Sequence, residues 1–205
     1  MKRVTIKDIA NHLCLSPSTV SRALADDKNI RQDTKTLISQ AADELGYRRN
    51  RLAVSLRSGR TNIIGVIVDQ MTAPSTLHIL AGAERHLHSK GINMMVANSE
   101  GSQSRERDNL MMMHDAQVDG MVIAVCDPNE NSSVFMRLKR LGMPMVFLQL
   151  APSGIIASNV HHDGDMADLD YQALGEKGAE LLLKIIENPG EPSERVCIHA
   201  GDATK

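Results

Sequence analysis

The sequence predicts two structural units of different class: an all-α unit at the amino terminus, followed by an α/β unit with a parallel sheet. Apolar residues recur at helical spacing in three short segments before Gly46, whereas beyond Asn62 apolar runs of strand length alternate with helical segments. Residues 1–60 hold 12 of the 23 basic side chains but only 6 of the 25 acidic ones. One end of the chain therefore favours a polyanionic partner and the other repels it.

Each of the three amino-terminal helices has a start or stop signal. Thr5 can cap the first helix, with Asp8 three positions later, and Ser16-Pro17 starts the second with a capping hydroxyl and a proline at the first helical position. The third helix is predicted over residues 33–45, before Gly46. The residues expected to be buried are Ile6, Ile9, Ala10 and Leu13 in the first helix, Val20, Ala23 and Leu24 in the second, and Leu37, Ile38, Ala41, Ala42 and Leu45 in the third.

Two short helices joined by a tight turn and braced by a third predict a helix-turn-helix. Its second helix presents small polar side chains and one arginine, Arg22. Such a surface suits the major groove of DNA, where arginine pairs bidentately with guanine. At this point a generic three-helix bundle with a solvated polar face remains the alternative.

The segment VTIKDIANHLCLSPSTVSRAL, and then AADELGYRRNRLAVSLRSGRTNIIGVIV, closely resembles the amino-terminal signature of the lactose-repressor/galactose-repressor family of bacterial transcription regulators. The resemblance implies that Pro17, Ser18 and Arg22 read DNA bases. It also implies contacts with the DNA backbone, which set register without reading sequence. The residues expected to make them are Thr5, Ser16, Thr19, Ser21 and Asn50, together with the basic Arg51.

Two positions depart from the family pattern. Arg31 stands where the family has a capping serine or threonine, which weakens the expected start of the third helix. Arg49 stands where the family has proline, which adds positive charge beside the DNA and reduces stiffness.

Residues 47–61 are predicted to form a linker between a headpiece, residues 1–46, and a lobe, residues 62–205. The linker is basic, amphipathic and too short for a helix that is stable alone in water. The resemblance implies a hinge helix that orders on operator DNA, where Leu56 wedges into the minor groove with Ala53 on the same face. The alternative is a basic linker that merely binds phosphate.

The lobe is predicted to be α/β. Strands at 62–68, 93–98, 120–126 and 144–150 alternate with helices at 75–91, 105–117 and 131–141, which indicates a parallel sheet with right-handed crossovers. The resemblance implies a fold like a periplasmic sugar-binding protein, of which only one of two lobes is present.

The second lobe is expected to be lost by an internal deletion near Met166–Asp168. Residues 155–167 resemble the family segment that ends the first lobe, whereas residues 169–192 resemble one close to the family's carboxyl terminus. The late helix is expected to pack on the first lobe through an apolar stripe. That stripe is Leu174, Gly178, Leu181, Leu182, Ile185 and Ile186.

One wall of the family's effector cleft is left, at the predicted strand ends. We call it the effector wall; it consists of Asp69, Ser75, Asn98, Asp127 and Gln149. A ligand is buried only when two walls enclose it. The wall is therefore interpreted as an exposed rim, and the sugar or nucleoside effector of full-length relatives is not expected to bind tightly.

No metal or cofactor is predicted. His161 and His162 are adjacent on a strand and point to opposite faces, so they and Asp163 are not expected to share an ion. The three cysteines lie far apart and are expected to be reduced thiols. The chain has neither a phosphate-binding glycine loop nor a nucleophile elbow, and no apolar run that would span a bilayer.

These observations predict a bacterial, cytoplasmic and nucleoid-associated transcriptional regulator, a repressor in particular, that binds a pseudo-palindromic operator in double-stranded DNA as a homodimer. Membrane association is not expected. The alternative, from a different class, is a small-molecule sensor or βαβ enzyme whose amino-terminal bundle is incidental.

Overall fold

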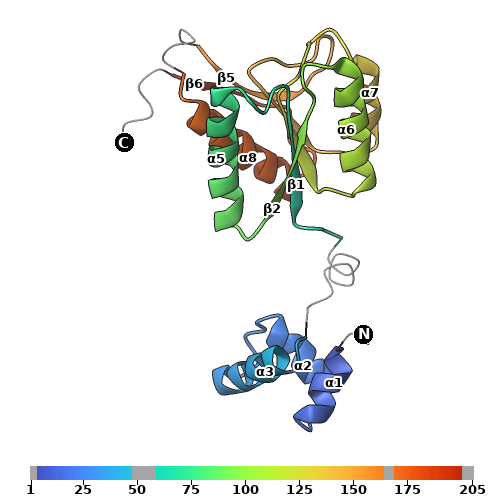
Figure 1. Ribbon diagram of the computed structural model, residues 1–205, viewed down its shortest axis with the longest axis vertical. Helices are drawn as coiled ribbons and strands as arrows, with labels where there is room; N and C mark the ends of the chain where they lie inside the picture. The colour runs from blue at the N-terminus through green and yellow to red at the C-terminus, as the bar shows by residue number, and fades with distance from the viewer. Residues whose placement is uncertain (1–3, 48–58, 164–168, 200–205) are drawn as a thin grey trace. The chain divides into compact units, whose positions relative to one another are not determined.

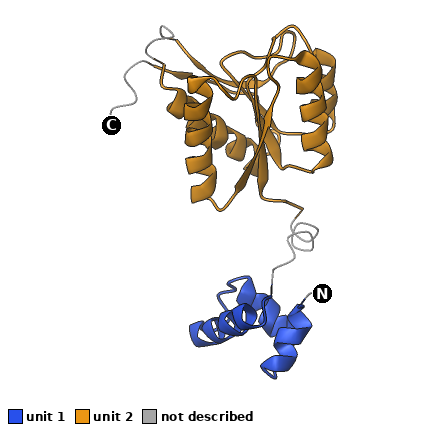
Figure 2. Cartoon of the chain, viewed as in Figure 1, with its two compact units in different colours: residues 1–54 blue, residues 55–205 orange. Residues whose placement is uncertain are grey.

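The computed structural model describes residues 4–47, 59–163 and 169–199. The chain divides into two compact units, residues 1–54 and 55–205, which Figure 2 colours separately. The division falls within the segment assigned to the linker, most of which lies outside the described residues.

The headpiece consists of three helices: α1 (Ile6–His12), α2 (Pro17–Leu24) and α3 (Gln32–Glu44). Gly46 adopts φ +69° after α3, as expected for a glycine that ends a helix. One prediction is wrong: Leu37 is 50% exposed, because Ile38, Ala41 and Ala42 supply the inward face of α3. The buried residues of the headpiece are Ile9, Ala10, Val20, Ala23, Ile38, Ala41 and Ala42.

The lobe is a six-stranded parallel sheet in the order β2-β1-β3-β4-β5-β6, with helices on both faces (Figure 1). The elements are β1 (Ile63–Val68), α5 (Pro74–Ser89), β2 (Asn93–Asn98), α6 (Gln103–Asp115), β3 (Gly120–Ile123), α7 (Ser132–Arg140), β4 (Met145–Leu148), β5 (Ser158–His162), α8 (Tyr171–Glu187) and β6 (Arg195–Ile198). The predicted α/β class is confirmed.

Each face of the sheet has its own core. Helices α5 and α8 cover one face, where Ala83 and Leu182 are fully buried. Helices α6 and α7 cover the other face, where Phe135 and Phe147 meet edge to face with ring centroids 5.3 Å apart. Both faces are covered along the central strands, which explains why those strands are continuous apolar runs.

Helix α8 packs on the lobe as predicted. It lies against α5 at two glycines, Gly82 and Gly175, where one helix backbone approaches the other too closely for a side chain. Leu174, Gly178, Leu181 and Leu182 are buried, and Ile185 and Ile186 are partly buried. The apolar stripe of α8 therefore completes the core of this lobe.

Other differences concern element boundaries and one additional strand. Strands β3 and β4 end three and two residues before their predicted ends. Helix α6 begins at Gln103, two residues before the predicted start, because Ser102 caps it by accepting a hydrogen bond from the Arg105 backbone N–H. Strand β6 was not predicted; its four residues pair in parallel with β5. Among the described residues, no helix combines the length and the apolar character needed to cross a membrane.

Candidate nucleic-acid interface

The amino terminus of α2 is built by a cluster of hydroxyls. The Ser16 Oγ accepts a hydrogen bond from the Thr19 backbone N–H at 3.1 Å and lies 2.8 Å from the hydroxyls of both Ser18 and Thr19. Pro17 occupies the first turn, where its missing N–H costs nothing. The first turn of the helix is therefore held firmly while its polar side chains stay at the surface.

The outer face of α2 is accessible. Ser16, Pro17, Ser18 and Arg22 are exposed, and Thr19 and Ser21 are partly buried. Val20 and Ala23 on the inner face are buried against α1 and α3. The three predicted base-reading residues thus share one open surface.

Arg22 forms no hydrogen bond or salt bridge with the described part of the chain. The Arg22 charge acts weakly on Asp27, whose pKa is lowered chiefly because the Asn29 backbone N–H donates to its carboxylate, and in smaller part by Arg22. The guanidinium donors of Arg22 remain available to an acceptor outside the headpiece.

The starts of α1 and α3 differ in whether a side chain caps the helix. The Asp8 carboxylate accepts hydrogen bonds from the backbone N–H and the hydroxyl of Thr5, both at 2.7 Å, so the exposed Thr5 is fixed at the start of α1. At the start of α3, Arg31 has the extended backbone of a cap residue but its side chain caps nothing. A salt bridge of 2.6 Å between Lys35 and Asp26 ties α3 to the preceding loop.

Four predicted DNA contacts lie outside the described residues. They are Asn50 and Arg51, expected to contact the backbone, and Ala53 and Leu56, expected to enter the minor groove.

All five effector-wall residues lie at or beyond the carboxyl ends of strands β1 to β4. Four of their side chains already accept a backbone hydrogen bond. Asn98 accepts from the Met71 N–H, Asp127 from that of Asn129, and Gln149 from that of His162. Asp69 accepts from the N–H of the next residue, and Ser75 is partly buried in the first turn of α5. The side chains of this wall therefore bond to the backbone of the same loop or of a neighbouring segment.

A buried carboxylate beside the effector wall escaped the sequence analysis. Glu106 is fully buried in α6, and its two oxygens accept hydrogen bonds of 2.7 Å from the Cys126 backbone N–H and the Asn131 side-chain amide. Burial, aided by the Glu106 charge, raises the pKa of the Cys126 thiol to about 11. Glu106 stands one helical turn before Leu110 on the inward face of α6, and that position in the pattern was the available signal.

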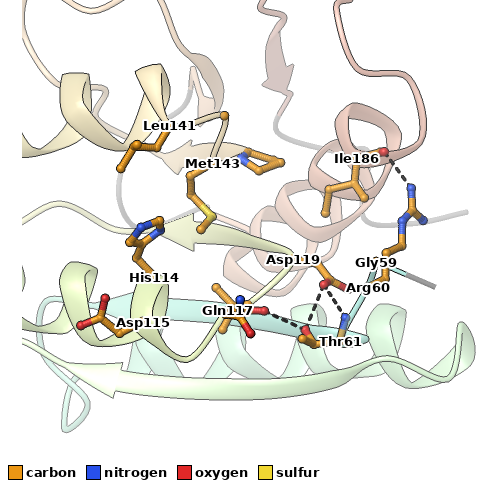
Figure 3. Close-up of a pocket in the computed structure, with 13 residues that line it drawn as sticks. Gly59, Arg60, Thr61, His114, Asp115, Gln117, Asp119, Leu141, Met143 and Ile186 are labelled. Carbon is orange, nitrogen blue, oxygen red and sulfur yellow. Dashed lines mark hydrogen bonds between the residues drawn. The ribbon is translucent and has the colours of Figure 1, made fainter. Parts of the chain in front are cut away.

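A hollow of about 780 Å³ lies at the opposite, amino-terminal edge of the sheet, where the chain enters β1 (Figure 3). Arg60 donates to the Ile186 carbonyl at 2.8 Å, and Thr61 donates to Asp119. No effector-wall residue lines this hollow. The start of the lobe is thus attached directly to β3 and α8.

Two family models match the chain. Residues 5–50 match the model described as bacterial regulatory proteins of the lacI family, and residues 61–203 match the model of periplasmic binding proteins and the sugar-binding domain of the LacI family. Together they cover the headpiece and the lobe.

Relatives of known function have similar sequences. The HTH-type transcriptional repressor PurR of Photobacterium profundum is 26% identical over 78% of this chain and 48% of its own length. The ribose operon repressor of Escherichia coli is 29% identical over 85% of this chain and 53% of its own length. The chain spans about half the length of these relatives.

Solved structures share the fold. The lac repressor bound to ONPG in the repressed state superposes with a TM-score of 0.74 at 13% identity, over 97% of each chain. The lac repressor dimer bound to operator and the anti-inducer ONPF superposes with a TM-score of 0.64 at 17% identity, over 96% of this chain and 66% of that one.

Proposed function

Since this chain belongs to the LacI family of bacterial regulatory proteins, we propose that it is a transcriptional regulator, and specifically a repressor, that binds a defined DNA sequence through α2. One observation carries the proposal: Pro17, Ser18 and Arg22 form an exposed surface on a capped helix, and Arg22 has no hydrogen-bonding partner among the described residues. The excess of basic side chains in residues 1–60 supplies the attraction to phosphate.

The enzyme alternative is wrong, since members of this family regulate transcription and are not enzymes. The site of action that follows from the proposed function is the nucleoid in the bacterial cytoplasm.

The proposed active form is a homodimer on a pseudo-palindromic operator. One headpiece makes few base contacts, and two half-sites multiply the discrimination. The outward face of α5 supports this assembly, because Leu77 is 60% exposed and Ala81 and Arg85 follow it at one-turn spacing, away from α8. A related lac repressor was solved as a dimer bound to operator.

The hinge contributes the second proposed contact with DNA. Leu56 of each protomer enters the minor groove and unstacks a base step, which bends the duplex. Leu56→Ala should therefore reduce operator bending measured by fluorescence transfer between labelled DNA ends, and leave the headpiece folded. A bend angle that this substitution does not change would refute the wedge.

Effector response is proposed to be weak or lost. The described lobe offers one wall, on which the side chains of Asn98, Asp127 and Gln149 already accept hydrogen bonds from backbone N–H groups of the lobe itself. A sugar or nucleoside would stay largely exposed there, and exposed ligands bind weakly. Calorimetric titration with sugars, nucleosides and their phosphates tests this, and a submicromolar ligand that releases DNA would contradict it.

The test of the main proposal starts from a pool of random duplexes. Rounds of selection on the full chain should converge on a sequence with two-fold symmetry, and fluorescence anisotropy should show that this duplex binds at least about 10³-fold more tightly than random DNA at the same salt concentration. Equal affinity for both would remove sequence-specific regulation.

A further inference from the structure

Strands β5 and β6 form one edge of the sheet (Figure 1). Their carboxyl ends bring together three side chains of different chemistry. Asp163 follows β5 directly, Cys197 lies within β6, and His199 follows β6. The His199 Nδ1 lies 2.6 Å from an Asp163 carboxylate oxygen and 3.9 Å from the Cys197 Sγ. One donor atom from each residue lies within 4.8 Å of the other two.

The strand register explains why these side chains meet. His161 pairs with Cys197 across the two parallel strands, so their side chains share a face of the sheet. Asp163 and His199 each stand two residues further on, and the two-residue period of a strand returns them to that same face. The arrangement is therefore set by the sheet itself.

We propose that Asp163, Cys197 and His199 form a binding site for a zinc-like divalent cation. A thiolate, an imidazole and a carboxylate are the ligand types that zinc takes, and three protein ligands leave a fourth position for water. Bond lengths of about 2.0 to 2.3 Å in a tetrahedron place neighbouring ligand atoms about 3.3 to 3.6 Å apart. The His199–Asp163 separation lies below that range and the His199–Cys197 separation above it, so shifts of less than about 1 Å would bring His199 to coordinating distance from both neighbours, and Cys197 and Asp163, within 4.8 Å of each other, are close enough to follow.

A buried nitrogen without a partner lies on the same face of the sheet. The Nδ1 of His161 is buried and makes no hydrogen bond within the described structure. It belongs to the residue paired with Cys197, on the face of the sheet that carries the three ligands. The Nδ1 atoms of His162 and His114 are unpaired in the same way, so the proposal rests on the geometry of the three ligands.

This inference differs from the sequence-based expectation of no metal site. That expectation considered His161 with its neighbours His162 and Asp163, whereas the ligands come from two strands. The available signal was Cys197-x-His199, two ligand types at the spacing of one strand face.

The first experiment titrates Co²⁺, a spectroscopic substitute for Zn²⁺, into the full chain under reducing conditions. One equivalent should produce thiolate-to-metal charge-transfer absorption. Cys197→Ser should abolish the absorption, whereas Cys14→Ser and Cys126→Ser should retain it. Absorption that persists in Cys197→Ser, or no saturable uptake at one equivalent, would overturn the proposal.

A calorimetric titration with Zn²⁺ tests the other two ligands. His199→Ala and Asp163→Ala should each lower the affinity by at least about tenfold, since even changes behind the ligands cost this much. His88→Ala, at an exposed histidine of α5, is the matched control and should change nothing. Equal affinities in all of these variants, or a preference for Mg²⁺ or Ca²⁺, would contradict the assignment.

Folding is controlled for separately. Cys197→His replaces one zinc ligand by another, so it should keep Zn²⁺ binding while losing the charge-transfer absorption of Co²⁺. Zn²⁺ should raise the melting temperature of the unchanged protein, because a ligand that binds only the folded state stabilises it. It should not do so for Cys197→Ser, whose circular dichroism should remain that of a folded lobe.

Discussion

The Asp119 carboxylate holds Thr61 at the entrance of the lobe by two hydrogen bonds, 2.7 Å from the Thr61 backbone nitrogen and 2.9 Å from its hydroxyl. Its second oxygen accepts from the Asn62 backbone N–H at 2.8 Å. These bonds join residues 57 or more positions apart in sequence, and Figure 3 shows those between Asp119 and Thr61. One side chain at the start of β3 thus fixes the point at which the chain leaves the linker and enters β1.

Asp119→Ala should therefore destabilise the lobe. It leaves the backbone N–H groups of Thr61 and Asn62 without their acceptor, the first at a partly buried position, while the Thr61 hydroxyl keeps the Gln117 carbonyl; the loss should cost about 2 kcal/mol. Urea denaturation followed by circular dichroism measures the loss. The control is Asp115→Ala, because Asp115 lines the same hollow and is exposed, and its removal should cost less than about 0.5 kcal/mol. Equal losses in the two variants would show that the three hydrogen bonds contribute nothing specific.

Contact between α5 and α8 leads to a second prediction. A Cβ on Gly175 would lie 1.9 Å from the Ile79 carbonyl oxygen, so Gly175→Ala must push two helix backbones apart, at a cost of about 3 kcal/mol. At Gly178 the nearest atom, 2.7 Å away, belongs to the Leu148 side chain, which can move.

Gly178→Ala is therefore the matched control, and it should stay within about 1 kcal/mol of the unchanged protein, since alanine also favours the helix. Thermal unfolding compares the two variants. A mild effect at Gly175 would mean that the backbones of α8 and α5 do not approach each other as closely as described.

The glycine contacts also illustrate what the sequence can predict. Central strands such as β1 are buried on both faces and appear in the sequence as apolar runs, and the apolar residues of α8 recur at helical spacing. The class and order of these elements were therefore predictable. Leu37 was misjudged because three short helices enclose too little volume to bury every apolar side chain of α3.

Contacts between residues far apart in the sequence could not be predicted. Nothing in the sequence around Asp119 indicates its hydrogen bonds with Thr61. The proximity of Cys197 to Asp163 likewise depends on the pairing of β6 with β5, which the sequence does not specify. Strand β6 is only partly buried at the sheet edge, so its four residues lack the continuous apolar run that marks β3 and β4. Residues that act through distant neighbours depend on register and topology, which a single sequence does not specify.

The uncapped start of α3 leads to a third prediction. Arg31→Ser places a hydroxyl at a position whose backbone already has the extended geometry of a cap residue, and should stabilise α3 by about 1 kcal/mol. Hydrogen exchange of the α3 amides in the full chain should slow by about fivefold as a result.

Lys28→Ser controls for the lost charge. Lys28 is exposed in the loop before α3 and lies outside the cap position, so the same substitution there should leave α3 exchange unchanged. If both variants slow the exchange alike, reduced charge repulsion rather than capping explains the effect.

The last prediction separates base reading from phosphate binding, once a selected operator is in hand. Arg22→Ala should weaken operator binding by about 1 to 3 kcal/mol and relax discrimination at particular base pairs, because a bidentate contact with guanine is lost. Arg51→Ala should instead weaken operator and random DNA equally and reduce the slope of affinity against salt by about one.

Binding isotherms on the operator, on single-base variants and on random duplex at several salt concentrations distinguish the two roles. Lys7→Ala is a third variant for comparison, since Lys7 is exposed on α1 outside the proposed reading surface. It should change base preference less than Arg22→Ala does and the salt slope less than Arg51→Ala does. Should Arg22→Ala reduce binding to random DNA as strongly as to the operator, Arg22 would be a phosphate contact. The base-reading role would then pass to Ser18 or to side chains outside α2.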